Sequence, residues 1–309
     1  LVVPQRPPYC SMLIRRLALL LAPLVLAVSL GAQGTTGLVA FGDSLSDNGR
    51  LFHVFGIPSA PYWNGRFSNG PVWVERVGPQ LGIPSSNILD LAVGGSTTSN
   101  VLNLQVVPYI SQLGTVPEGT VVTLWAGAND LLGLIDDPTQ DPTAIIGEAI
   151  TNLSDSIILL LGAGAEDVLI VNLPDLSLTP RVNGLGDPTA TLAARLLSEA
   201  FNAALLSATL EIESIFNVDL VEIDAFSILT DVVADPEGFG FVNATDAALQ
   251  GSTVDPKEAG FVFWDDIHPT TRAHREFARS VIRELRRRED LRAGYEPMPQ
   301  VPQYLLRRP

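Results

Sequence analysis

Apolar residues in this chain gather either into short runs or into longer stretches with helical spacing. The short runs predict buried strands at 38–41, 88–93, 120–125, 168–172 and 218–223. The longer stretches predict helices at 72–81, 101–113, 143–161, 189–215, 225–233 and 270–288. Short strands that alternate with helices predict an α/β fold, in which helices cover both faces of a five-stranded parallel sheet.

Two irregular segments interrupt this alternation. Residues 53–71 are rich in proline, glycine, asparagine and aromatic side chains, and so long a loop in a compact domain is often functional. Residues 235–260 predict a second loop. No internal repeat or linker divides residues 35–295, so we expect a single domain there, followed by a flexible tail at 296–309.

The N-terminal segment predicts an export signal. Met12 begins a short positive region, an apolar run follows at 17–30, and small residues precede Gly34. These features predict a signal peptide at 12–33 and a mature protein that is secreted or periplasmic. A membrane anchor is disfavoured because the apolar run is shorter than the roughly 20 residues that a span needs. Residues 1–11 precede Met12, and a misassigned start codon would account for them.

The composition excludes several classes of partner. The chain has 309 residues, of which 46% are hydrophobic, and a net charge of −15. Removing the signal with Arg6, Arg15 and Arg16 leaves 16 basic residues (19 less 3) against 34 acidic ones, a net charge of −18. Thinly spread acidity argues against nucleic acid, which requires clustered Lys and Arg, and against adhesion to anionic lipid.

The position of the cysteine and the hydropathy of the chain bear on disulfides, metal sites and membrane segments. The only cysteine, Cys10, lies upstream of the signal, so the mature chain should have no disulfide and no cysteine-ligated metal. We find no second apolar stretch of roughly 18 residues and therefore expect no integral membrane segment in the mature chain. The sequence makes no prediction of an oligomeric state.

Candidate residues for chemistry follow the predicted strand ends, which a parallel sheet brings to one edge. They are Ser44 after the first strand, Gly94 and Gly95 after the second, Asn129 after the third, Asp175 after the fourth, and Asp265, Asp266 and His268 in the late loop. A serine, an amide, glycine N–H groups and an Asp/His pair are the parts of an acyl-transfer site.

Ser44 is the candidate nucleophile, and a serine hydroxyl needs a base. His268 is the candidate base because Asp265, three residues earlier, can fix its tautomer through Nδ1. We interpret His53 and His274 as structural, and Asp266 as a helix cap or ion-pair partner. Taken alone, the stretch around Ser44 is equally compatible with a turn that merely caps the next helix.

An oxyanion needs donors that already point at it. The Ser44 N–H, expected at the start of a helix, can supply one, the Gly95 N–H a second, and the Asn129 amide a third. The alternatives are a tight turn for the glycine pair and an ordinary turn or cap for Asn129. The combination of all these features, rather than any one of them, favours a catalytic site.

Four separated sequence blocks resemble the GDSL esterase/lipase family of the SGNH hydrolase superfamily. They lie at 41–47, 91–95, 127–130 and 265–269, in the family's order. The aromatic segment from Tyr62 to Gly70 is similar to the branch of secreted phospholipases, lecithinases and hemolysins. The resemblance implies a flavodoxin-like three-layer α/β/α sandwich of SGNH hydrolase type.

The same resemblance implies roles for individual residues. It makes Ser44 the nucleophile, His268 the base and Asp265 its orienting partner, with Ser44, Gly95 and Asn129 in the oxyanion hole. Gly94 replaces Gly95 as donor if the turn is shifted by one residue. At the third block Ala128 departs from the family's pattern, whereas Asn129 and Asp130 are kept.

We therefore expect a secreted serine hydrolase of carboxylic esters that needs no metal or cofactor. Its expected substrate is a lipid or a small-molecule ester. The alternatives are a carbohydrate acetylesterase that uses the same site and, less favoured, a secreted binding protein without catalysis. Aromatic residues of the loop at 53–71 could flank an acyl chain, stack on sugars or pack the loop down.

Overall fold

The computed structural model describes residues 35–292, apart from residue 138. The described residues form one compact unit. The predicted signal peptide at 12–33 and the predicted tail at 296–309 lie outside the described residues.

The described chain is built on a parallel five-stranded sheet, as the sequence predicts. Its strands are β1 (Gly37–Gly42), β2 (Ile88–Asp90), β3 (Thr120–Trp125), β4 (Asp167–Val171) and β5 (Val221–Ile223). Their spatial order is β2-β1-β3-β4-β5, and each neighbouring pair is parallel. This is the flavodoxin-like order, in which ligands bind at the carboxyl ends of the strands.

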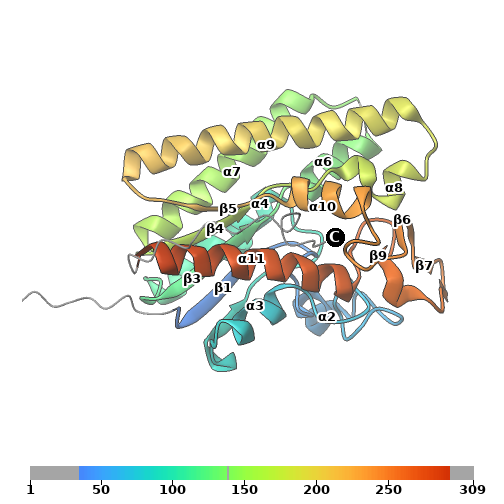
Figure 1. Ribbon diagram of the computed structural model, residues 1–309. Coiled ribbons are helices and arrows are strands. Elements are labelled where there is room, and N and C mark those ends of the chain that lie inside the picture. Colours follow the sequence, from blue (N-terminus) through green and yellow to red (C-terminus); the bar gives the residue numbers. More distant parts are fainter. Residues whose placement is uncertain (1–34, 138, 293–309) are drawn as a thin grey trace, which may run out of the picture. The chain divides into compact units, whose positions relative to one another are not determined.

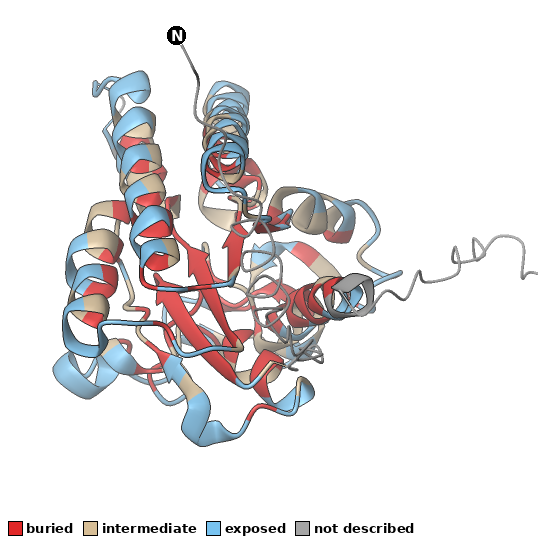
Figure 2. Ribbon diagram, turned by 90° about the vertical axis from the view of Figure 1, so that its left-hand side faces the viewer, coloured by how far each residue is buried: buried red, intermediate tan, exposed pale blue. Residues whose placement is uncertain are grey.

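Each face of the sheet carries its own hydrophobic core, because successive side chains of a strand point to opposite faces. In β1, Val39 and Phe41 pack with α7 (Pro142–Gly162) and α9 (Pro188–Phe216). Leu38 and Ala40 pack with α3 (Val74–Gln80) and α11 (Thr271–Arg292). The two layers of helices lie on opposite sides of the strands (Figure 1), and the strands are buried almost throughout (Figure 2).

Local sequence explains where the long helices begin. Asp-Pro-Thr stands at the start of both α7 and α9, and in each the aspartate side chain accepts the threonine N–H. Proline suits the first helical turn because its missing N–H would have no partner there. The remaining α-helices of the described chain are α2 (Arg50–Phe55), α4 (Thr98–Asn100), α5 (Val107–Leu113), α6 (Ala128–Asp136), α8 (Pro180–Asn183) and α10 (Ala225–Ala234).

The structure corrects the predicted elements in several places. The stretch at 101–113 begins as a π-helix, Val101–Val106, because Pro108 has no N–H for the regular α-helical bond. Helix α6 was not predicted. The loop at 235–260 contains short strands, which are β6 (Asn243–Ala247), β7 (Leu249–Gln250) and β8 (Thr253–Val254), and β6 pairs with β9 (Phe261–Phe263).

Helix α7 also corrects the expectation that no second apolar stretch exists. Among the described residues it is the one helix whose length and composition would allow it to cross a membrane. Its buried residues, which include Leu153, Ile157 and Leu160, pack in the core with α9 and the sheet.

Candidate active site

Ser44 lies directly beyond β1 in a single turn. The Asp43 carbonyl accepts the N–H groups of Ser46 (3.1 Å) and Asp47 (3.0 Å), and α2 begins only at Arg50. The expectation that Ser44 stands at the start of a helix was therefore wrong. The turn nevertheless leaves the Ser44 N–H without an acceptor within residues 35–292.

A buried glutamine fixes the end of β1. Gln105 Oε1 accepts the Gly42 N–H (2.9 Å), and its Nε2 donates to the Gly42 carbonyl (2.8 Å) and to Ser96 Oγ (3.2 Å). Gln105 lies in the π-helix, and such helices often occur at functional sites. The side chain thus ties the backbone just before Ser44 to the segment that follows β2.

Ser44, His268 and Asp265 form a hydrogen-bonded chain. His268 Nε2 lies 2.8 Å from Ser44 Oγ, and its Nδ1 lies 2.7 Å from Asp265 Oδ2. Asp265 Oδ1 accepts the N–H groups of Ile267 (2.9 Å) and His268 (2.7 Å). Burial opposes ionisation of Asp265, but the charge of His268 and these hydrogen bonds keep the pKa of the carboxyl below its ordinary value.

The aromatic loop packs against this pair. The Tyr62 hydroxyl donates to Asp265 Oδ2 (2.7 Å), and its ring contacts Trp264 edge-on. The Phe67 ring lies over the imidazole of His268, with 5.0 Å between centroids. Of the three roles that the sequence left open for these aromatics, Tyr62 and Phe67 therefore take the packing role.

The two glycines after β2 have different surroundings. The Gly94 N–H donates to Asp47 Oδ2 (2.8 Å), and a side chain at Gly94 would meet the Phe67 ring. Gly95 has a φ of 78°, which favours glycine, and its N–H has no acceptor within the described chain. Of the two, only Gly95 offers a free donor.

Asn129 lies in the first turn of α6 and lines the same cavity as Ser44. Its Nδ2 donates to the Ser96 carbonyl (2.9 Å) and makes a longer contact of 3.4 Å to Asp43 Oδ2. Burial raises the pKa of Asp43 to about 7. Asp130 accepts the N–H and hydroxyl of Thr98, which joins α6 to the segment after Gly95.

An apolar cavity opens beside Ser44 and His268. Its volume is about 950 Å³ when the open solvent at its mouth is included. Helices α10 and α11 and strand β9 contribute Ile228, Leu229, Val232, Val262 and Phe277 to its apolar wall, and Phe241, which follows α10, adds a further ring. Such a wall offers contacts to hydrocarbon and few hydrogen-bonding groups.

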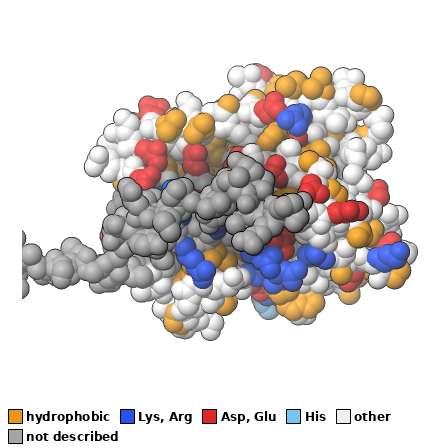
Figure 3. Space-filling view, viewed as in Figure 1, with side chains coloured by type: hydrophobic (Ala, Val, Ile, Leu, Met, Phe, Trp, Pro, Cys, Tyr) orange, Lys and Arg blue, Asp and Glu red, His pale blue; other side chains and the backbone are white. Residues whose placement is uncertain are grey.

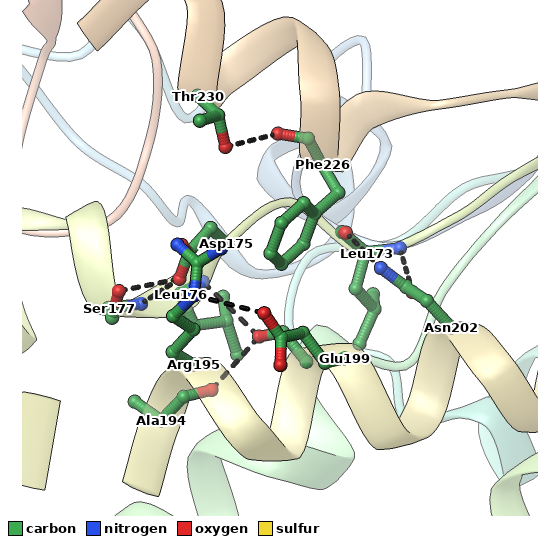
Figure 4. A network of polar contacts seen from close by, with 11 residues as sticks. Leu173, Asp175, Leu176, Ser177, Ala194, Arg195, Glu199, Asn202, Phe226 and Thr230 are labelled. Carbon is green, nitrogen blue, oxygen red and sulfur yellow. Dashed lines mark hydrogen bonds and ion pairs between the residues drawn. The ribbon is translucent and has the colours of Figure 1, made fainter. Parts of the chain in front are cut away.

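The wall segment after β4 is held by a polar network (Figure 4). Buried Asp175 binds Arg195 (2.7 Å) and accepts both the N–H and the hydroxyl of Ser177. Asn202 bonds both the N–H and the carbonyl of Leu173. Asp175 was a candidate for chemistry because it follows the fourth strand, but its partners are structural. The network positions the cavity residues of this segment.

The other titratable candidates lie apart from the hydrogen-bonded chain. His53 is exposed on α2, and Asp266 is exposed next to Asp265. His274 is buried on α11 and lines the cavity, and its Nε2 has no hydrogen-bond partner in the described chain. Burial, together with His268 and Arg76, lowers the pKa of His274 to about 3. No cluster of His, Cys, Asp and Glu suited to a metal ion occurs among the described residues.

Comparisons with known proteins agree with this architecture. Residues 38–281 match the family described as "GDSL-like Lipase/Acylhydrolase". The chain is similar to phosphatidylcholine-sterol acyltransferase of Aeromonas hydrophila, with 28% identity over 77% of this chain and 86% of that protein. Its fold is similar to that of Axe2, an acetylxylan esterase from Geobacillus stearothermophilus, with a TM-score of 0.50, 15% identity and coverage of 82% and 96%.

Two further relatives are longer proteins. The chain is 28% identical to the thermolabile hemolysin of Vibrio parahaemolyticus over 79% of its own length, and 29% identical to the secreted effector protein SseJ of Salmonella typhimurium over 81%. It spans 62% and 63% of these two relatives.

Proposed function

The chain belongs to the GDSL-like lipase/acylhydrolase family and is a carboxylic-ester hydrolase, and on that premise we propose that Ser44, His268 and Asp265 form its catalytic triad. The observation that carries the proposal is the continuous chain of contacts from Ser44 Oγ through His268 to Asp265. Each of the three residues is at most 8% exposed, so the hydrogen-bonded chain is shielded from competing water.

The geometry supports a two-step acyl transfer. His268 Nε2 takes the proton of Ser44 as Oγ attacks the ester carbonyl, and the ring then gives that proton to the leaving alcohol. Water, activated by the same nitrogen, cleaves the acyl-enzyme. Asp265 holds the imidazole through Nδ1 and stabilises the positive charge that the ring carries between these steps.

Three donors are available for the oxyanion. The N–H groups of Ser44 and Gly95 have no acceptor in the described chain, so they are free to bind the developing charge. Asn129 would supply the third through the Nδ2 hydrogen that makes the long contact to Asp43. Because the Gly94 N–H is occupied by Asp47, we assign the backbone donor of this turn to Gly95.

The cavity favours an ester with an apolar acyl chain. Its apolar wall can bury hydrocarbon, at about 25 cal/mol per Å² of area removed from water, whereas an acetyl group would leave most of it unfilled. The similarity to a phosphatidylcholine-sterol acyltransferase supports a lipid ester. The likeness to an acetylxylan esterase is a likeness of fold, so we place carbohydrate acetyl esters second.

Activity towards a series of nitrophenyl esters from acetate to laurate, with phosphatidylcholine and acetylated xylan beside it, tests this proposal. We expect kcat/KM to rise from acetate to medium chain lengths. Ser44→Ala should lower kcat by about 10⁴-fold or more while the protein keeps its melting temperature. Full turnover by this variant would exclude Ser44 as the nucleophile, and a maximum on acetylated xylan would exclude the acyl-lipid assignment.

We also propose that the protein is exported. The charged, apolar and small-residue regions at 12–33 support export, as does the similarity to a relative that is named a secreted effector. Expression of the full chain, followed by N-terminal sequencing of the protein outside the cytoplasm, tests the cleavage expected near residues 32–33.

A further inference from the structure

A second cavity lies beside the first turns of α11, and its walls are rich in arginine. Residues from the aromatic loop, α3, the segment before β9 and the start of α11 enclose about 620 Å³, open solvent included. They are Asn69, Arg76, Glu258, Ala259, Thr270, Thr271, Arg272 and Arg275. Basic side chains gather over α11 on this side of the molecule (Figure 3). In a chain of net charge −15, such a concentration of positive charge needs an explanation.

Two of the three arginines at this cavity have no carboxylate partner among the described residues. Arg76 and Arg272 make no ion pair within the described residues, and their Nε atoms are buried without a hydrogen-bond partner there. Arg275 has only a distant contact of 3.7 Å to Glu276. Burial and the like charge of Arg275 lower the pKa of Arg76, whereas the Glu75 carboxylate acts in the opposite direction, so burial and the charge of Arg275 both disfavour the charged form of Arg76.

Neighbouring residues hold the guanidinium groups in place. Arg76 Nη2 donates to Thr271 Oγ1 (2.5 Å), and the Thr271 N–H donates to Asn69 Oδ1 (2.8 Å). Arg272 lies over the Phe241 ring, 5.1 Å from its centre. A guanidinium held in this way loses little freedom when it binds a planar or tetrahedral anion. The start of α11 adds the positive end of a 22-residue helix.

We propose that this cavity binds a phosphate group through Arg76, Arg272 and Arg275. Arginine forks match phosphate oxygens in a bidentate manner, and several of them on one anion distinguish phosphate from a simple halide. Glu258, which lines the same cavity, opposes an anion and so limits the affinity. The site is separate from Ser44, and it does not depend on the ester-hydrolase assignment.

Two sources can supply such a group, and direct binding separates them. Isothermal titration calorimetry of the wild-type protein at low ionic strength measures inorganic phosphate and, separately, glycerophosphocholine, a phosphate diester without acyl chains. Binding of both ligands identifies a lipid headgroup site, whereas binding of inorganic phosphate alone identifies a site for free phosphate. Binding of neither overturns the proposal.

Variants locate the site. Arg272→Gln/Arg275→Gln should weaken binding roughly tenfold, because charge-assisted hydrogen bonds are lost. Arg283→Gln is the matched control, since Arg283 is exposed on the same helix outside the cavity, and its affinity should stay within about twofold of wild type. Equal affinities of the double variant and wild type would overturn the proposal.

Two single variants guard against loss of folding. Arg275→Gln removes an exposed guanidinium and should retain the wild-type melting temperature while it weakens binding. Glu258→Gln should tighten phosphate binding about threefold, because it removes a repelling charge from a partly exposed position. A gain of affinity cannot arise from misfolding, so unchanged or weaker binding by Glu258→Gln would count against the site.

Discussion

The Tyr62 hydroxyl and the Nδ1 atom of His268 contact the same oxygen of Asp265, each at 2.7 Å. Tyr62 comes from the loop before α3, whereas the His–Asp pair comes from the loop after β9. The phenol O–H therefore draws on the same carboxylate charge that stabilises the imidazole of His268. Tyr62 is a positioning residue, because it acts on the proposed base through Asp265.

Replacing Tyr62 by phenylalanine should move the acidic limb of the activity–pH profile to higher pH. Without the phenol donor, Asp265 keeps more charge on Oδ2 and holds the imidazolium proton of His268 more tightly. We expect a shift of about half a pH unit and a fall in kcat of a few-fold, measured as kcat/KM for a soluble nitrophenyl ester between pH 5 and 9.

Tyr109→Phe provides the control for this experiment. The Tyr109 hydroxyl is also buried, but it has no partner among the described residues, and Tyr109 belongs to the hydrophobic core that α7 shares. Its removal should leave the pH profile in place. If the activity–pH profile of Tyr62→Phe also matched that of wild type, the hydrogen bond from Tyr62 to Asp265 would have no effect on the proposed base.

Asn129→Ala should lower kcat by about 10²-fold with little change in KM. The lost amide would stabilise charge that develops only in the transition state, and single oxyanion donors are typically worth this much. Steady-state kinetics on the same ester check the separation of kcat from KM. Asn103→Ala, on the exposed side of the π-helix, is the matched control. A rise in KM at constant kcat would show that Asn129 binds substrate rather than the oxyanion.

The sequence predicted which edge of the sheet carries the proposed triad, because the signals for this edge are local. Each predicted strand is a short apolar run, and the runs that predict β1, β2 and β3 are each followed within two residues by a glycine. The flavodoxin-like arrangement of the strands was implied by the family resemblance and not by the apolar pattern. Asp265 and His268 are three residues apart, so their contact could be anticipated from spacing. The same logic predicted that Ser44 and Asn129 would share one edge of the sheet.

The residues that were missed act across long separations. Tyr62 and Asp265 are 203 residues apart, and Gln105 and Gly42 are 63 apart, so no spacing rule reveals either contact. Helix α6 was not predicted because the sequence of its first turn, which begins at Ala128, is typical of a turn after a strand. The strands of the 235–260 segment are too short and polar to produce an alternating pattern.

Leu229→Trp should shift the chain-length preference towards short esters. The larger ring would occupy the cavity between α10 and β9, so medium and long acyl chains would lose buried area. We expect kcat/KM for decanoate to fall about tenfold and that for acetate to change less than threefold, across one series of nitrophenyl esters. Leu210→Trp, at an exposed position on α9, should leave the preference unchanged. An equal loss of kcat/KM for all chain lengths would mean that the acyl chain binds outside this cavity.

Two buried groups should give the protein opposing dependences of stability on pH. The folded-state pKa of His274 is about 3, below its ordinary value of 6.5, so between these values the unfolded chain binds a proton that the folded chain does not. Stability from neutral His274 is therefore lost as pH falls from 6.5 towards 3. Asp43, whose pKa rises to about 7, contributes stability that is present below 3.8 and is lost as pH rises towards 7.

His274→Gln isolates the first effect. We expect the free energy of unfolding of wild type to fall relative to the variant by on the order of a few kcal/mol between pH 6.5 and 4, as measured by urea denaturation. Asp43→Asn should show the opposite sign, because wild type loses stability relative to this variant as pH rises from 4 to 7. Since the two groups act in opposite directions, the free energy of unfolding of wild type can be nearly independent of pH. The effect of each group is therefore measured as the difference between wild type and its variant. A difference between wild type and His274→Gln that is constant with pH would mean that His274 titrates equally in the folded and unfolded chains.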